Sequence, residues 1–246
     1  AYFIVGFNLM YPGDGWIIDG WMGGFSLTSL EPAGVGADGV DLTYASVGSD
    51  FFFQLMFCAA TASIVSGTVA ERVKLWPFLI FTVVLTGIFY PISASWQWGG
   101  GWLSEAGFSD FAGSTVVHSC GGWAALAGAL ILGARAGKYK DGQVNPMPGS
   151  NLPLATLGTF ILWLGWFGFN GGSQLAMGTL GDVADVSRIF SNTNAAAAGG
   201  AGREACLRAR GGHGGRGAAG HPGNGASLSL YSDGYISSVL GGGTVR

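Results

Sequence analysis

One histidine of this chain, His118, lies inside an apolar stretch, residues 112–134, that is long enough to cross a lipid bilayer. An imidazole in such a segment loses much of its hydration, so its presence favours a function: a conduction path, a proton relay or a ligand contact inside a helix bundle. The alternative is a structural histidine, hydrogen-bonded to a neighbouring helix. Because ionisable residues are costly inside a membrane, we expect His118 to have a functional role.

No pattern elsewhere in the sequence predicts catalysis. The chain has no nucleophile elbow, no phosphate-binding loop, no set of metal ligands at a suitable spacing and no carboxylate pair around a cleft. Its three cysteines, Cys58, Cys120 and Cys206, form neither a metal-binding nor a disulfide pattern, and the first two lie in apolar stretches as small packing residues. We therefore expect no enzyme, no metal and no cofactor.

The composition indicates a membrane protein. Of the 246 residues, 49% are hydrophobic and 10% are charged, and the mean hydropathy is +0.41. Soluble domains carry about 25% charged residues, so this chain is too poor in charge for that class. The 46 glycines follow no collagen-like period and fit close helix–helix contacts in a bilayer. A net charge of −3 gives no reason to expect nucleic-acid binding.

Four apolar segments have the length of about 20 residues that a spanning helix needs: 51–70, 75–95, 112–134 and 152–172. A fifth segment, 183–200, is shorter and contains polar side chains, so we expect part of a helix there. Residues 1–10 are typical of the end of a helix that begins further upstream. The sequence thus predicts an all-α polytopic membrane protein and is expected to be a fragment, with about four complete and one or two partial transmembrane helices.

The charges of the loops predict the orientation. No Lys or Arg precedes Arg72, and loop 96–111 has none either, whereas loops 71–74 and 135–151 are basic. Basic loops stay on the cytoplasmic side of a membrane. Loops 71–74 and 135–151 are therefore expected to be cytoplasmic, and 11–50 and 96–111 external.

The sequence changes character after residue 200. Residues 201–246 are rich in Gly, Ala and Arg and show no apolar period. Such a segment can be a disordered basic tail that meets nucleic acid or anionic lipid. Translation of GC-rich DNA in a shifted reading frame also gives this composition. Because the apolar pattern stops within a helix, we favour the frameshift and treat 1–200 as the transmembrane domain.

Four blocks of sequence resemble the ammonium transporter (Amt/Mep/Rh) family, Amt branch: GTVAER at 67–72, WGGG at 98–101, DFAGSTVVH at 110–118 and GWFGFNGGS at 165–173. They follow the family's order and spacing over residues 50–200. The resemblance implies a fold of about eleven transmembrane helices in two inverted halves, a homotrimer with one pore per subunit, and ammonium or ammonia as substrate. This chain would hold the end of helix 2, helices 3 to 6 and part of helix 7.

The resemblance also implies roles for single residues. Trp98 and Ser173 match the external site that recruits ammonium, to which Phe57 and Asp110 also belong. Phe57 and Phe169 match the paired rings that gate the pore, His118 matches the first of two pore histidines, and Phe53 and Trp166 match residues lining the path. Trp98 would attract a cation through its ring face, and Ser173 would accept one hydrogen bond from it.

Each role has a plainer alternative. Phe57 and Phe169 can be ordinary core or lipid-facing rings, since the chain has 16 phenylalanines. Trp98 stands near a membrane boundary, where tryptophan is enriched as an anchor. For Asp110 we favour a structural role, as a helix cap that shapes the site without touching a free cation.

The family's second pore histidine is missing here, because His213 and His221 lie in the Gly/Arg-rich region and are not expected to line a pore. By resemblance, a cytoplasmic PII-type regulator is a further expected partner beside the lipid bilayer of the cell membrane. Three other functions stay open: a membrane-bound ammonium sensor, an Rh-like channel for neutral gas, and a nonfunctional truncated product.

Overall fold

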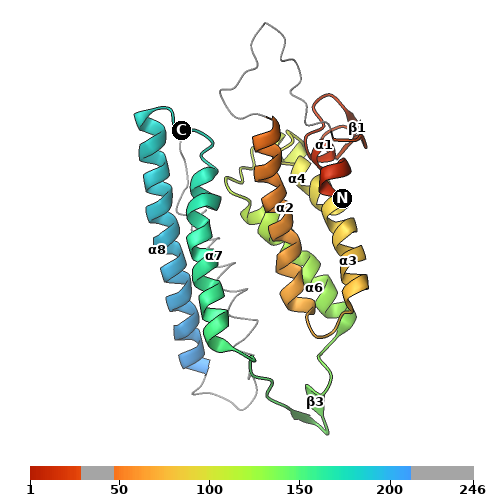
Figure 1. The fold of residues 1–246 in the computed structure, drawn as a ribbon, viewed down its shortest axis with the longest axis vertical. Coiled ribbons are helices and arrows are strands. Elements are labelled where there is room, and N and C mark those ends of the chain that lie inside the picture. Colours follow the sequence, from red (N-terminus) through yellow and green to blue (C-terminus); the bar gives the residue numbers. More distant parts are fainter. Residues whose placement is uncertain (29–46, 212–246) are drawn as a thin grey trace, which may run out of the picture. The chain divides into compact units, whose positions relative to one another are not determined.

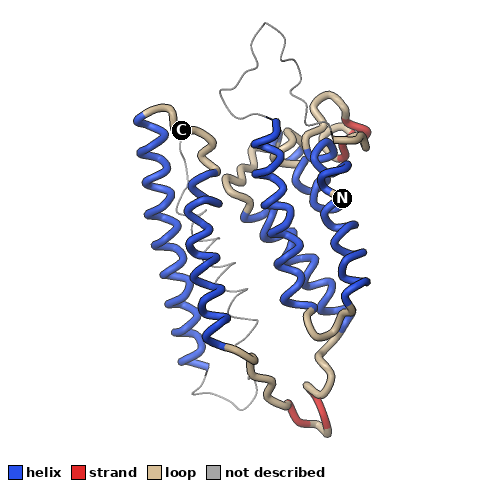
Figure 2. Tube along the Cα trace, in the orientation of Figure 1, coloured by secondary structure: helices blue, strands red, loops and turns tan. Residues whose placement is uncertain are grey.

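The computed structural model describes residues 1–28 and 47–211, with side chains up to residue 200. The chain forms two compact units, Ala1–Gly133 and Ala134–Arg246, which we describe separately. Both units are mainly helical, with two short hairpins as the only strands of the described residues (Figures 1 and 2).

The first unit begins with two short helical segments and a β-hairpin, after which long helices follow. Its elements are η1 (Tyr2–Gly6), α1 (Phe7–Met10), β1 (Trp16–Ile18), β2 (Met22–Gly23), α2 (Val47–Val69), α3 (Leu75–Val84), η2 (Leu85–Phe89), α4 (Tyr90–Ser95), α5 (Trp102–Glu105), η3 (Ser114–Ser119) and α6 (Cys120–Leu132). The segments labelled η are π-helical turns. Strands β1 and β2 pair antiparallel.

Four helical segments of the described residues are long and apolar enough to cross a membrane: Val47–Val69, Leu75–Ser95, Ser114–Leu132 and Leu152–Gly172. They correspond to the four segments expected from the sequence. The first begins four residues earlier than expected, because the apolar pattern starts at Phe51 but the helical backbone already includes Asp50 in its first turn. Large apolar side chains such as Trp76, Ile131 and Leu164 are exposed on these helices, as lipid-facing surfaces require.

Two of these segments contain a π-helical turn that the sequence analysis did not anticipate. In Leu75–Ser95 the turn η2 ends just before Tyr90, and Pro91 follows within the helix. Proline has no N–H, so the regular bond from residue 91 to the carbonyl of Gly87 is missing. A wider turn lets the helix continue past this position. In Ser114–Leu132 the turn η3 contains His118, and π-turns within α-helices often mark functional positions.

Helices α2 and α6 pack closely because a glycine lets their backbones approach. A methyl group on Gly121 would lie 2.8 Å from the Thr61 carbonyl oxygen, and one on Gly128 would lie 2.8 Å from Val69 Cγ1. Around this contact Ala62, Val65, Val69, Leu85 and Ala125 form a buried apolar cluster. By contrast, no atom of a neighbouring helix lies within 4 Å of a methyl group placed on Gly122 or Gly168.

At the predicted cytoplasmic end of the first unit, Arg72 connects the end of α2 with the end of α6. Its guanidinium donates hydrogen bonds to the carbonyl oxygens of Thr68, on α2, and Gly133, directly after α6. The two predicted cytoplasmic loops, 71–74 and 135–151, therefore leave this unit at the same end (Figure 1).

The second unit consists of a hairpin and two helices: β3 (Tyr139–Lys140), β4 (Gln143–Val144), α7 (Leu152–Gly172) and α8 (Leu180–Gly211). Helix α7 has the bounds expected from the sequence. Helix α8 starts three residues before the expected fifth segment and continues to Gly211, so the boundary predicted at residue 200 lies inside this helix. The rest of the predicted tail lies outside the described residues.

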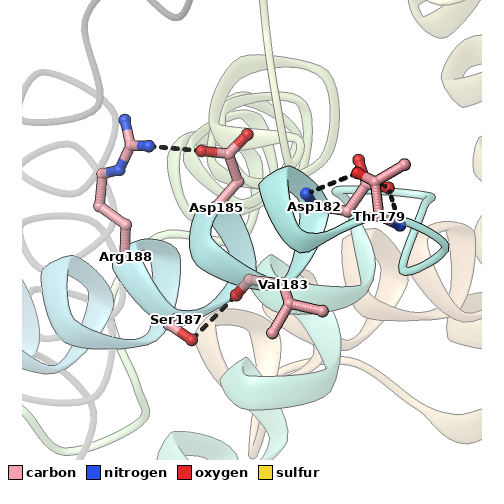
Figure 3. A network of polar contacts seen from close by, with 6 residues as sticks. All are labelled: Thr179, Asp182, Val183, Asp185, Ser187 and Arg188. Carbon is pink, nitrogen blue, oxygen red and sulfur yellow. Dashed lines mark hydrogen bonds and ion pairs between the residues drawn. The ribbon is translucent and has the colours of Figure 1, made fainter.

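The start of α8 is set by a reciprocal cap (Figure 3). The Thr179 hydroxyl oxygen accepts a hydrogen bond from the N–H of Asp182 at 3.1 Å, and the Asp182 carboxylate accepts from the hydroxyl and the N–H of Thr179 at 2.8 and 2.9 Å. These bonds lower the pKa of the Asp182 carboxyl, and the bond from the Thr179 hydroxyl contributes most. An Asp185–Arg188 ion pair follows one turn later.

Candidate functional site

Trp98 lies just after α4 and contacts two elements of the first unit. Its indole Nε1–H donates a hydrogen bond to the backbone carbonyl of Asp110 at 2.8 Å. The centroid of its ring lies 5.7 Å from that of the Phe57 ring, and the two ring planes meet at 85°. Phe57 in turn contacts Phe53, one helical turn earlier, at 4.6 Å. The structure therefore brings three predicted aromatic residues together at one end of α2.

Asp110 is buried and binds the first turn of the helix that carries His118. One carboxylate oxygen accepts from the N–H groups of Gly113 and Ser114 at 2.8 and 2.9 Å, and from the Ser114 hydroxyl at 3.3 Å. The other accepts from the N–H groups of Thr115 and Val116, both at 2.8 Å. These are the amides that a helix start leaves without internal partners, so the carboxylate acts as a cap.

Gly113 connects the cap, the tryptophan and the histidine. Its φ is +90°, and a methyl group placed on it would lie 2.5 Å from Val117 Cγ2 and 3.0 Å from Trp98 Cη2. Its carbonyl oxygen accepts hydrogen bonds from the N–H groups of Val117 and His118, both at 3.0 Å. Only glycine satisfies both the left-handed backbone and the missing space. The sequence analysis did not single out this residue, although its place in the block DFAGS was a signal for a turn.

The His118 ring is buried, with 8% of the residue exposed. Its Nδ1 lies 3.1 Å from the Gly113 carbonyl oxygen. Because a carbonyl can only accept, this contact assigns the hydrogen to Nδ1, and in the neutral ring Nε2 is then the nitrogen that accepts hydrogen bonds. The π-helical turn and the Asp110 cap thus fix the position, the orientation and the tautomer of the ring.

Thr61 joins α2 to the turn that carries His118. Its hydroxyl lies 3.2 Å from the Phe57 carbonyl and 3.2 Å from the Val117 carbonyl, and the side chain is fully buried. Thr61 was not among the predicted site residues, because a threonine within an apolar helix gives no signal for the helix it will contact. Its bonds set the level of Phe57 relative to His118.

The other predicted site residues, Trp166, Phe169 and Ser173, lie on or directly after α7 in the second unit. The Ser173 hydroxyl donates to the Phe169 carbonyl at 2.7 Å, so the lone pairs of its oxygen are available to accept a hydrogen bond. Asn170 between them is buried and donates from Nδ2 to the Thr193 hydroxyl of α8 at 3.0 Å. Trp166 is also buried.

Within residues 1–28 and 47–211, no three or more His, Cys, Asp or Glu side chains gather in a way that could hold a metal ion. The first unit combines aromatic rings with an imidazole whose Nδ1 lies 3.1 Å from the Gly113 carbonyl oxygen. Such a combination suits a small cation or its neutral conjugate base.

Comparisons with known proteins identify relatives. The sequence profile of the Ammonium Transporter Family matches residues 1–208. The ammonium transporter Amt2 of Archaeoglobus fulgidus is 45% identical over an alignment of 212 residues, and the match covers 82% of this chain and 42% of that protein. This chain therefore spans less than half of the length of that relative.

Solved structures show the same likeness. A structure described as a sensor Amt protein superimposes with a TM-score of 0.73 at 35% identity, over 97% of this chain and 58% of its own. A mutant of Mep2 from Candida albicans superimposes with a TM-score of 0.72 at 27% identity, over 97% of this chain and 54% of its own.

Proposed function

This chain belongs to the ammonium transporter family and is a polytopic helical membrane protein, and from that premise we propose that the full-length protein carries ammonium or ammonia across the cell membrane. The contact that supports this proposal best is the one between Trp98 and Phe57, whose rings lie 5.7 Å apart. It places a cation-attracting ring beside a potential gate, next to the cap of the helix that carries His118.

The first step is recruitment of ammonium on the external side. The faces of Trp98 and Phe57 attract the cation through their quadrupoles, and Ser173 accepts one hydrogen bond, since its own hydrogen is directed to the Phe169 carbonyl. Phe53 extends the aromatic wall. Asp110 acts on this site indirectly: its carboxylate is occupied by backbone N–H groups, and its carbonyl orients Trp98.

The second step is passage through an apolar constriction, and the family resemblance assigns its two gating rings to Phe57 and Phe169. An ion without its hydration shell crosses such a gate at high cost, whereas ammonium can lose a proton and pass as ammonia. Potassium, of similar size, has no proton to lose. Below the gate His118 meets the substrate, and Nε2 is the nitrogen able to accept a hydrogen bond from ammonia. Trp166 lines the same path.

The rest of the assembly follows from the family. We expect a homotrimer in which the second half of each subunit supplies the second pore histidine and the opposite wall of each pore. A PII-type regulator is expected on the cytoplasmic side, where loops 71–74 and 135–151 lie in the predicted topology. These loops leave the first unit at one end, where Arg72 binds the Gly133 carbonyl.

A second candidate function is ammonium sensing, which is favoured by the likeness to the sensor Amt protein at 35% identity. The same pore would then report the presence of ammonium to a signalling domain. Downstream sequence decides between the two: a kinase or cyclase domain in the same reading frame indicates a sensor, and its absence from the complete gene indicates a transporter.

Ammonium-evoked currents test the proposal. In the full-length protein, expressed in oocytes, ammonium is expected to evoke inward currents, whereas a channel for neutral gas gives none. Trp98→Leu should raise the half-saturating ammonium concentration about five- to tenfold, because it removes one cation–π contact of about 1 kcal/mol. Trp96→Leu is the matched control, since Trp96 instead donates to the Trp21 carbonyl. Equal shifts in the two variants would contradict the recruitment role of Trp98.

A further inference from the structure

Two buried side chains outside the site described above carry an oxygen atom with no hydrogen-bond partner among the described residues: Gln54, on α2, and Tyr90, at the start of α4. Gln54 is 6% exposed and Tyr90 is 0% exposed. Both belong to helices that cross the membrane. A polar atom without a partner in such surroundings costs several kcal/mol, so both atoms need an explanation.

The packing of the helices places these two residues at the same level. The Cys58 thiol donates to the Thr86 carbonyl at 3.7 Å, which connects α2 with η2. These two helices run in opposite directions (Figure 1). Gln54 lies one turn before Cys58, and Tyr90 lies about one turn after Thr86, so each is displaced from this contact toward the same end of the unit.

The ring of Tyr2 gives a second, independent measure of this proximity. It lies 6.1 Å from the ring of Tyr90 and 6.1 Å from the ring of Phe51. Phe51 precedes Gln54 by three residues on α2 and therefore shares its face. Gln54 and Tyr90 thus border the same small region between α2 and α4.

The two unpartnered atoms complement each other chemically. Gln54 Oε1 can only accept a hydrogen bond, whereas the Tyr90 hydroxyl can both donate and accept. Buried waters are held by two to four such polar partners.

We propose that Gln54 Oε1 and Tyr90 Oη together bind one small neutral molecule, either water or ammonia, between α2 and α4. The Tyr90 hydroxyl donates to its oxygen or nitrogen, and the molecule donates to Gln54 Oε1. The two side chains do not bond to each other in the structure, so a bridging molecule satisfies both. Because Tyr90 is completely enclosed, the occupant has to be small. Gln54 lies one turn before Phe57 on α2.

Thermal unfolding and a high-resolution structure of the full-length protein test this site without measuring transport. Tyr90→Phe removes only the hydroxyl oxygen, and Gln54→Leu removes only the amide. We expect each variant to lower the unfolding temperature by several degrees, and the double variant to lower it no further than the worse single variant, because both changes release the same molecule. Tyr139→Phe, at an exposed tyrosine, is the control and should change nothing.

The electron density is expected to show one peak within hydrogen-bond distance of both oxygen atoms. If the occupant is ammonia, ammonium chloride at alkaline pH should raise the unfolding temperature of the wild type above the value in the same concentration of sodium chloride. Tyr90→Phe should show no such difference between the two salts. An occupant that is water gives the peak without this dependence. A higher unfolding temperature of Tyr90→Phe, or a direct bond between Gln54 and Tyr90 with no peak, would overturn the proposal. Loss of transport alone would concern the proposed function and leave this site unaffected.

Discussion

The indole N–H of Trp98 donates to the backbone carbonyl of Asp110 at 2.8 Å, while the carboxylate of the same aspartate caps the helix that carries His118. One residue therefore sets the orientation of the proposed recruitment ring and the start of the pore helix. In this arrangement an acidic side chain shapes the proposed cation site while its carboxylate is occupied by backbone N–H groups. It also makes the site sensitive to changes that leave Trp98 and His118 themselves intact.

Asp110→Asn should destabilise the protein, by about 2–4 kcal/mol, because an amide offers one acceptor oxygen and turns its NH2 group toward two buried N–H donors. The measurement is thermal unfolding of the full-length protein in detergent. Asp19→Asn, at an exposed aspartate, is the matched control and should have almost no effect. An Asp110→Asn protein with the stability of the wild type would show that the cap contributes little.

Gly113→Ala should lower the stability of the protein by more than the strain of a positive φ alone would. The added methyl group would meet Val117 Cγ2 at 2.5 Å and Trp98 Cη2 at 3.0 Å. Gly107→Ala is the control, because Gly107 has a φ of +81° with nothing within 4 Å. It should cost only the backbone strain, about 1–2 kcal/mol. Tryptophan fluorescence and unfolding temperature measure the difference, and equal effects of the two substitutions would contradict the close packing of Trp98 on Gly113.

Gly121→Ala should weaken the contact between α2 and α6 by about 1–3 kcal/mol, because its methyl group would lie 2.8 Å from the Thr61 carbonyl, which cannot move without the helix. The adjacent Gly122→Ala has open space and should be neutral or stabilising by up to about 1 kcal/mol. Unfolding temperatures of the two variants provide the test. A reversed order would mean that α6 presents a different face to α2.

The predicted topology is open to a labelling experiment. Glu105→Cys should react with a membrane-impermeant thiol reagent on intact cells, and Lys140→Cys only after the cells are opened, because loop 96–111 is predicted to be external and loop 135–151 cytoplasmic. Both side chains are exposed. The unsubstituted protein measures the background from Cys58, Cys120 and Cys206. Labelling of Lys140→Cys on intact cells would reverse the orientation.

The sequence predicted the helices well, because length and hydropathy alone determine whether a segment can span a bilayer. Helix α7 and the span Leu75–Ser95 have the expected bounds, and the other two spans differ by a few residues at their ends. The sequence could not show the π-helical turns at Leu85–Phe89 and Ser114–Ser119. Apolar side chains suit both kinds of turn, and the choice depends on packing around Pro91 and Asp110.

The site was predicted in part. The blocks of sequence singled out Trp98, Phe57, Asp110 and His118, and the structure places all four in one unit. The roles of Gly113 and Thr61 were missed, because they depend on a left-handed backbone and on a hydroxyl reaching a carbonyl 56 residues further along the chain. Neither is visible in a one-dimensional pattern. The sequence likewise does not distinguish Gly121, which packs on the Thr61 carbonyl, from the adjacent Gly122, which has open space.

The most direct test of the central claim is the ammonium-evoked current of His118→Ala in the full-length protein, compared with wild type and with Leu130→Ala, a change at an exposed position on the same helix. Currents are normalised to the amount of protein at the cell surface, and potassium is tested beside ammonium. If His118 lines the path, the ammonium current of His118→Ala should be lost, or should lose its selectivity over potassium, while Leu130→Ala conducts like the wild type. A His118→Ala protein with wild-type current and wild-type selectivity would contradict the account.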